Sequence, residues 1–174
     1  MFNICNIFNT VNVCIKRMIE IADITKTICV TPSIMDENME ETISTLIRQK
    51  YERVCDEHDG VILEIHDILD IQNQISKDSC HINIRVKMRV SVVRPKKGSI
   101  FTFKPTLIIA KGIFGKIHDL ISLFIPDTYL PGWVYKNETF TAGNNTITKD
   151  TFVDVAVTDI KFNTTKYNCI CKLN

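Results

Sequence analysis

One segment limits what this chain can fold into more than any other: residues 81–93 alternate between apolar and polar side chains almost without a break. The apolar positions are Ile82, Ile84, Val86, Met88, Val90 and Val92, and the polar positions between them are Arg85, Lys87, Arg89 and Ser91. Successive side chains of a β-strand point to opposite faces of its sheet. The alternation therefore predicts a strand with one buried face and one solvated, basic face.

The residues before this strand predict another strand and a helix. Residues 18–31 are dense in β-branched side chains, and Pro32 ends the run. Apolar residues then recur at helical spacing, namely Met39, Ile43, Leu46, Ile47 and Val54. Asp36 can cap the first turn of this helix. Lys50 and Arg53 fall in its last turn, where the helix dipole favours positive charge.

A turn at Asp59–Gly60 separates the helix from residues 60–71, which alternate in part and predict a further strand. Residues 72–79 are polar and predict a loop before the alternating strand. The first half of the chain therefore predicts the order strand, helix, strand, strand, which is an RNP-like lobe.

Pro95 and Gly98 mark a joint in the sequence, and five short apolar runs follow it. The runs cover residues 99–110 (broken by Pro105), 113–117, 120–125, 152–160 and 167–173. A longer excursion over residues 126–149 separates the third run from the fourth. This is the layout of a small OB barrel. We therefore predict an α+β fold, with the N-terminal lobe followed by a C-terminal five-stranded OB-type β-barrel.

Three regions follow from this division. Residues 1–17 are apolar but rich in Asn, and their only charges come last, whereas a secretory signal has its positive charge first. We interpret them as a loose N-terminal arm, or as residues upstream of a start at Met18. Residues 18–95 form the predicted N-terminal domain, and residues 96–174 form the predicted OB-fold domain. No run approaches the roughly 18 apolar residues that span a bilayer, so we expect no membrane partner.

Charge is distributed unevenly although the net charge is only +1. Residues 36–70 hold eleven acidic and three basic side chains, a net charge of −8. Residues 77–116 hold ten basic side chains and one acidic side chain, a net charge of +9. The two regions therefore face different partners or each other, and the basic one suggests a polyanion.

The seven cysteines indicate an intracellular, reducing compartment. Their number is odd, and they form no CxxC pair. Cys169 and Cys171 would share one face of a strand and cannot form a relaxed disulfide with each other. We expect reduced thiols.

No combination of residues predicts catalysis. The pairs His58–Asp59, His66–Asp67 and His118–Asp119 resemble part of a metal-dependent hydrolase site, but adjacent strand residues point to opposite faces and cannot bind one ion together. There is no paired zinc-ligand spacing, no GxSxG sequence and no Gly-rich phosphate loop. We expect no catalytic residue, no cofactor and no metal. A small metal-dependent hydrolase is the alternative from another functional class.

A basic cluster with interleaved aromatic residues is the best candidate for binding. OB folds hold single strands with cations along the phosphates and aromatic faces against the bases. The candidate RNA-binding residues are Arg94, Lys96, Lys97, Lys104, Lys111, Phe114 and Lys116. We expect Phe101 and Phe103 to fill the core instead, whereas Phe114 is open to either role.

The basic row Arg85, Lys87 and Arg89 allows three interpretations. It can be a solvated sheet face, it can contact RNA, or it can pack against the acidic residues 36–70 or against another protein chain.

Several segments, taken in order, resemble the seventh-subunit (stalk) family of eukaryotic RNA polymerase II, which also has archaeal members. In the first half they are ICVTPSIM (28–35) before the helix, HDGVILEIHDI (58–68) and VKMRVSVVRPKKGSIF (86–101). The second half resembles an RNA-binding domain of the ribosomal protein S-one type, through KGIFGKI (111–117), LFIPDTYLP (123–131), FVDVAVTDI (152–160) and YNCICKL (167–173). The chain departs from the family in its extra arm, in the absence of a glycine-rich aromatic tip after His58, and in a shorter loop at 72–79.

The resemblance implies a non-catalytic polymerase subunit that works at the site of transcription. Residues 18–95 would dock on the polymerase core, with residues 28–71 in contact, and the barrel would hold single-stranded nascent RNA. A fourth-subunit-like stalk partner is also implied. The alternative is a free-standing OB-fold RNA-binding protein in translation or RNA decay. Frequent Ile, Asn and Lys suggest an AT-rich genome, which fits a large DNA virus with its own polymerase. The expected site of transcription is the nucleus, or the cytoplasm or virion if the protein is viral.

Overall fold

The structure is a computed structural model that describes residues 19–32, 38–75 and 82–174. The predicted arm at residues 1–17, the proposed cap Asp36 and the second half of the predicted loop at 72–79 lie outside this part of the chain. The described residues fall into two compact units, Ile19–Val93 and Arg94–Asn174.

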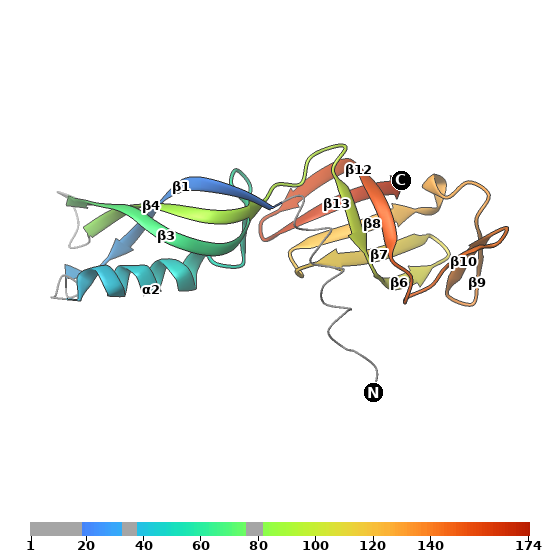
Figure 1. The fold of residues 1–174 in the computed structure, drawn as a ribbon, viewed down its shortest axis with the longest axis horizontal. Coiled ribbons are helices and arrows are strands. Elements are labelled where there is room, and N and C mark those ends of the chain that lie inside the picture. The colour runs from blue at the N-terminus through green and yellow to red at the C-terminus, as the bar shows by residue number, and fades with distance from the viewer. Residues whose placement is uncertain (1–18, 33–37, 76–81) are drawn as a thin grey trace, which may run out of the picture. The chain divides into compact units, whose positions relative to one another are not determined.

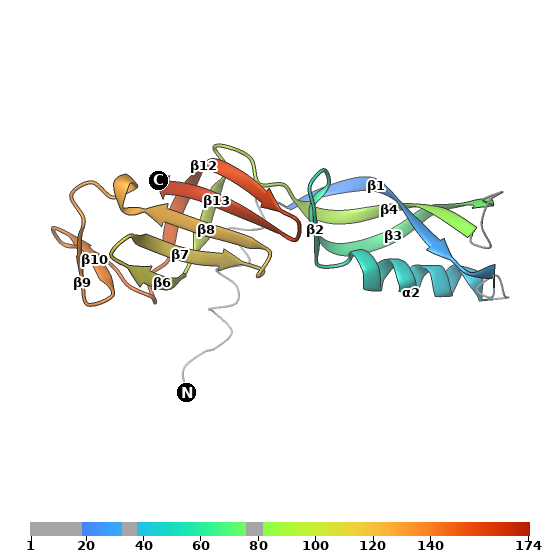
Figure 2. The same ribbon diagram turned by 180° about the vertical axis from the view of Figure 1, so that it is seen from behind.

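The N-terminal unit is a four-stranded antiparallel sheet covered on one side by a helix (Figures 1 and 2). Its elements are β1 (Ile19–Val30), α2 (Met39–Tyr51), β2 (Val54–Asp56), β3 (Gly60–Ile75) and β4 (Ile82–Val93). The strands lie in the order β1-β4-β3-β2. The alternating segment therefore occupies an interior strand, which agrees with its strict pattern.

The core of this unit lies between the sheet and the helix. Ile84, Val86, Met88, Val90 and Val92 of β4 are all fully buried, as the alternation predicts. Ile43 and Ile47 of α2 pack against them from the helix. Burying an aliphatic side chain of this size stabilises a fold by about 1.5–3 kcal/mol, so this cluster is the main support of the unit.

Two sequence predictions at the helix end were wrong. The helix stops at Tyr51, and Arg53 adopts a left-handed φ of 57°. Val54 therefore belongs to β2, where it is exposed, and Arg48 rather than Arg53 joins Lys50 in the last turn. The left-handed residue Arg53 ends the helical period after Tyr51. Val54 therefore lies outside the helix, although its spacing from Ile47 fits a helix.

Strand β3 differs from the simple alternation expected of it. Its register against β4 shifts between Ile62 and Glu64, between Ile65 and Asp67, and between Ile68 and Asp70. Each shift leaves one extra residue in β3, as a β-bulge does. The side chains that face the helix therefore recur every three residues, at Ile62, Ile65, Ile68 and Ile71. The strand also runs on to Ile75, into the segment predicted as a loop.

The C-terminal unit contains a six-stranded sheet with the order β5-β12-β13-β8-β7-β6. The strands are β5 (Ile100–Phe103), β6 (Pro105–Ile109), β7 (Gly112–Ile117), β8 (Ile121–Pro126), β12 (Val153–Asn163) and β13 (Lys166–Leu173). All neighbours are antiparallel except β8 and β13, which are parallel. The five predicted apolar runs all form strands, and the first run is split into two at Lys104.

The inner side of this sheet is a dense apolar core. Phe101 and Phe103 are each 2% exposed, which confirms them as core residues. A Cβ atom on Gly115 would lie 1.9 Å from the ring of Phe103. Gly115 is therefore needed for close packing of this ring against β7.

The excursion after β8 has structure that the sequence did not predict. A short 3-10 helix, η2 (Asp127–Tyr129), leads into β9 (Val134–Lys136), β10 (Thr139–Ala142) and β11 (Asn145–Ile147), which form a separate three-stranded sheet. Phe140 and Ile147 are paired across this sheet and buried. This small sheet lies next to β6, as Figure 1 shows.

Candidate nucleic-acid interface

Four apolar side chains form a row across the solvent-facing side of the six-stranded sheet. Register pairs Leu107 of β6 with Phe114 of β7, Phe114 with Phe124 of β8, and Phe124 with Ile170 of β13. Directly paired residues point to the same face of a sheet. Leu107 is 46% exposed and Ile170 is 40% exposed, while both rings are half-buried. The sheet therefore presents a continuous apolar strip four strands wide.

The two aromatic rings at the centre of this row are stacked. Their centroids lie 4.3 Å apart, with an angle of 23° between the ring planes. Aromatic pairs in this arrangement contribute about 0.5–1.5 kcal/mol beyond the area they bury. The pair is therefore held in a fixed orientation, with part of each ring accessible to solvent.

Gly112 positions the second ring. A Cβ atom there would lie 2.8 Å from Cε2 of Phe124 and 2.2 Å from the carbonyl oxygen of Ile125. Gly112 also has a φ of +145°, which side chains rarely adopt. A glycine at the start of β7 thus leaves room for Phe124 to lie flat against the sheet.

Cations flank the row at two places. Lys116 lies two residues beyond Phe114 on the same face of β7, and its ammonium is 3.9 Å from Asp119. At the other end, Lys97 binds Asp159 at 2.9 Å, and Asp159 is the register partner of Ile170. The hydrogen bond from Lys97 lowers the pKa of the Asp159 carboxyl. An ion pair therefore lies on each side of the apolar strip, Lys116 with Asp119 and Lys97 with Asp159.

The other predicted residues are more dispersed. Lys104 lies at the corner between β5 and β6, where its ammonium is 5.1 Å from the centre of the Phe152 ring. Lys111 is exposed in the turn from β6 to β7, and its carbonyl accepts a hydrogen bond from the amide of Asp127. Arg94 and Lys96 lie in the segment before β5. Only Phe114 and Lys116 are immediate neighbours on one face.

Sequence reasoning missed Phe124, Leu107 and Ile170. The signal for Phe124 was present, because Leu123 and Ile125 on either side of it are buried, and alternation then turns Phe124 outward. Ile170 lies between the buried Cys169 and Cys171 in the same way. The pairing of all four across strands depends on register, which no local pattern reveals.

The basic row of β4 has a different environment. Register places Arg89 between Asp23 and Asp67, and Lys87 between Thr25 and Asp70. Arg89 donates to Asp23 at 3.2 Å, and Lys87 lies 4.0 Å from the same carboxylate. The direct contacts of this row are therefore with Asp23 of β1, which lies outside the acidic residues 36–70. Among the described residues, no aromatic side chain shares this row.

The His-Asp pairs are part of the local structure. His58 and Asp59 lie in the β2–β3 turn, where their amides donate to Asp56. His118 and Asp119 are the first two residues of the three-residue β7–β8 turn and have φ values of 49° and 58°. His66 reaches Ser91 at 2.6 Å. Within the described part of the chain, no three His, Cys, Asp or Glu residues gather as metal ligands would.

Four cysteines lie in the described residues, and none of these forms a disulfide there. Burial raises the pKa of Cys169 to about 12, with Cys171 adding to the effect, and burial also raises the pKa of Cys171 to about 12. These two thiols therefore stay protonated and pack as core side chains. No helix among the described residues is long and apolar enough to cross a membrane.

Comparison with known proteins finds a similarity in the N-terminal unit. Residues 25–83 match the model of the SHS2 domain found in the N terminus of Rpb7p/Rpc25p/MJ0397. The match begins within β1, spans α2, β2 and β3, and ends at the start of β4. No curated protein matches the sequence.

Proposed function

Residues 25–83 give this chain the N-terminal domain of the Rpb7-like stalk-subunit family, and on that premise we propose that it is a non-catalytic subunit of a DNA-dependent RNA polymerase. In this role the N-terminal unit docks on the polymerase core, and the C-terminal unit contacts single-stranded nascent RNA. The partners are core subunits and a fourth-subunit-like stalk protein. The protein works at the site of transcription, in a reducing compartment, and a large DNA virus is a fitting source.

The strand order supports an OB-type barrel for the C-terminal unit. Strands β5 and β6 lie at opposite edges of the six-stranded sheet, yet only Lys104 separates them in the chain. The sheet must therefore curl until its two edges meet. With β5 and β6 counted as one bent strand, five strands with a parallel β8–β13 pair make up the barrel.

The stacked pair of Phe114 and Phe124 is the observation that carries the RNA proposal. Bases stack on exposed aromatic rings regardless of their identity, and nearby cations bind the phosphates. Here Lys116 lies on the same face as Phe114 and Phe124, and Lys97 lies beyond Ile170. The apolar strip has the width for several bases, because it crosses four strands about 4.8 Å apart.

Binding of a fluorescent single-stranded RNA to the full chain tests this site. We expect Phe114→Ala and Phe124→Ala each to weaken binding by about 1–3 kcal/mol, with little change in the salt dependence. The matched control is Tyr129→Ala, which removes a 43% exposed aromatic ring from η2 and should leave RNA affinity unchanged. Thermal unfolding of each variant separates lost binding from lost folding.

Equal affinity in the wild type and both phenylalanine variants would overturn the site. So would tighter binding to duplex than to single-stranded RNA, because stacking on the pair requires unpaired bases. A free-standing OB-fold RNA-binding protein remains the second candidate function. It would pass this RNA test but would not associate with polymerase core subunits.

A further inference from the structure

Within the described residues, the outer edge of β3 has no strand partner over most of its length. Strand β2 pairs only with Gly60–Ile62, and no other strand in the described residues pairs with this edge beyond Ile62. A sheet edge of this kind offers backbone donors and acceptors to an added strand. Side chains of α2 cover one part of this edge and leave another part open.

Helix α2 closes the edge at Ile65. Arg48 donates to the carbonyl of Ile65 at 2.5 Å, and Glu52 accepts from the amide of Ile65 at 3.1 Å. Arg48 and Glu52 also pair with each other at 2.9 Å. Two side chains of the helical segment therefore satisfy the backbone groups that a neighbouring strand would otherwise bind.

At Ile68 and Ile71, three and six residues after Ile65, no side chain of the described helix binds the backbone of this edge. Ile65, Ile68 and Ile71 pair with Val90, Met88 and Val86, which are alternate residues of β4. Alternate residues direct their backbone groups the same way. The amides and carbonyls of Ile68 and Ile71 therefore point outward as those of Ile65 do.

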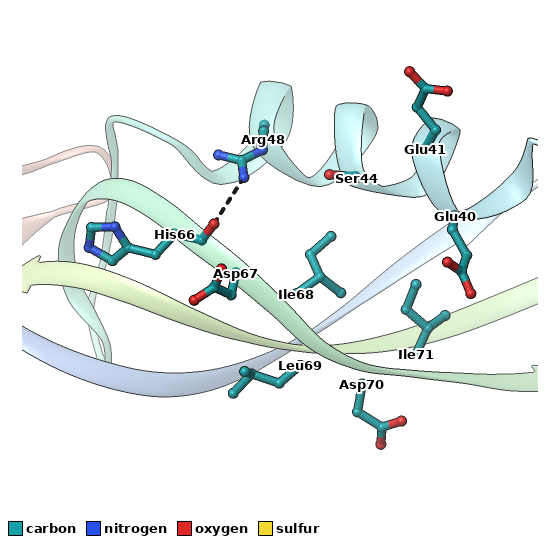
Figure 3. A pocket seen from close by; sticks show the side chains of 10 residues that line it. All are labelled: Glu40, Glu41, Ser44, Arg48, His66, Asp67, Ile68, Leu69, Asp70 and Ile71. Atoms are coloured by element: carbon teal, nitrogen blue, oxygen red, sulfur yellow. Dashed lines mark hydrogen bonds between the residues drawn. The ribbon is translucent and has the colours of Figure 1, made fainter.

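The helix does not fill the space beside these two residues. Ser44 and Glu40 lie one and two turns before Arg48, and a groove of about 650 Å³ runs between them and β3. Figure 3 shows Ile68 and Ile71 directed toward the helix, with Glu40 turned toward Ile71. Ile68 and Ile71 of β3 therefore form an apolar patch in a groove that is otherwise lined mainly by polar side chains.

The opposite side of the same edge is acidic. Asp67 and Asp70 are exposed, and Asp70 points away from the helix in Figure 3. Neither carboxylate forms an ion pair with any described residue. Their register partners, Arg89 and Lys87, pair with Asp23 instead. The Asp70 carboxylate accepts only a neutral hydrogen bond, from Gln72 at 2.8 Å.

We propose that the edge of β3 at Ile68–Ile71 binds an extended, basic segment of a polymerase core subunit as an added strand. Side chains of a strand alternate between faces. Apolar residues of the segment would pack on Ile68 and Ile71. The residues that alternate with them would be Lys or Arg and would lie beside Asp67 and Asp70. This inference rests on the proposed function and names the chemistry of the docking partner.

A short capped peptide of alternating valine and lysine serves as the probe, added to the full chain. We expect amide hydrogen exchange to slow at Ile68 and Ile71 when the peptide binds. Asp67→Asn together with Asp70→Asn should weaken binding about three- to tenfold at low salt, as loss of two exposed ion pairs predicts. The matched control, Asp119→Asn with Asp150→Asn, removes the same charge elsewhere and should leave affinity unchanged.

Two results would overturn the proposal: exchange that slows elsewhere but not at Ile68 and Ile71, or equal loss of affinity in both double variants. The Asp67/Asp70 variant should also reduce association of the full chain with polymerase core. If the wild type associates with the core and the variant does so equally well, the docking site is wrong and the proposed function stands. If the wild type does not associate at all, the proposed function fails.

Discussion

The chain has basic side chains on two solvent-facing sheet surfaces, and the side chains around them differ. On β4, Arg89 and Lys87 lie beside the carboxylate of Asp23 and have no aromatic neighbour in their row among the described residues. On β7, Lys116 also lies near a carboxylate, 3.9 Å from that of Asp119, but it adjoins a stacked aromatic pair. Positive charge in a sequence therefore does not by itself indicate a polyanion site. The proposed RNA site rests instead on the exposed apolar strip beside the charge.

The largest expected effect separates the core rings from the surface rings. Phe103→Ala should cost about 3–5 kcal/mol of unfolding free energy, because Phe103 is buried against Gly115. Phe114→Ala should cost about 1 kcal/mol, since its ring loses mainly the stacking contact. Urea unfolding of both variants measures this. Similar losses would mean that Phe114 belongs to the core and that the comparison fails.

The next effect concerns salt. Changing Lys96, Lys97, Lys111 and Lys116 together to Ala should lower RNA affinity roughly 10- to 100-fold at low salt and flatten the dependence on salt concentration. Each phosphate contact with a single strand contributes about 0.7 to that slope. Titration of RNA at several salt concentrations measures the change. An unaltered slope would show that these lysines do not contact phosphates.

A smaller effect tests the structural use of charge in the N-terminal unit. Lys26 binds Asp56 at 2.6 Å and Asp59 at 2.7 Å. Burial opposes ionisation of Asp56, but hydrogen bonds from Lys26 and from the amides of Asp59 and His58 lower its pKa to about 2. The ionised carboxylate therefore stabilises the fold above its ordinary pKa of 3.8, and this stabilisation is lost as pH falls toward 2.

Lys26→Met should therefore reduce the unfolding free energy at neutral pH by about 1–2 kcal/mol, after allowance for solvent screening. It should also flatten the loss of stability between about pH 4 and pH 2. Urea unfolding across this pH range measures both. Lys116→Met is the control, because its ion pair is exposed. Identical pH profiles for the wild type and Lys26→Met would contradict the role of Lys26.

The smallest expected effect is on RNA binding by the β4 row. Arg85→Gln, Lys87→Gln and Arg89→Gln combined should leave both RNA affinity and its salt dependence unchanged. The same titration as for the barrel lysines measures this. A flattened slope would place RNA on the N-terminal sheet as well and would remove the contrast between the two surfaces.

The sequence determined some parts of this structure better than others, for physical reasons. The even-numbered residues of β4 from Ile84 to Val92 are buried as predicted, because an interior strand without bulges keeps a period of two. In β3 the three bulges change that period to three. Strand alternation alone therefore predicted only some of the isoleucines that face the helix. Bulges depend on tertiary packing and leave little local trace.

The candidate RNA site was predictable only in part. Phe114 stands out because it precedes Gly115 in a basic segment, and Phe101 and Phe103 alternate as core residues do. The partnership of Phe114 with Phe124 depends on the register of β7 against β8, and on the space left by Gly112. Neither feature can be read from residue spacing along one strand.

Isolation of the full chain from its native source, with identification of the proteins that elute with it, tests the central claim most directly. We predict that the large subunits of an RNA polymerase elute with it, and that RNA bound in the complex crosslinks to the segment holding Phe114 and Phe124. Elution without any polymerase subunit, alone or with factors of translation or RNA decay, would contradict the assignment as a stalk subunit.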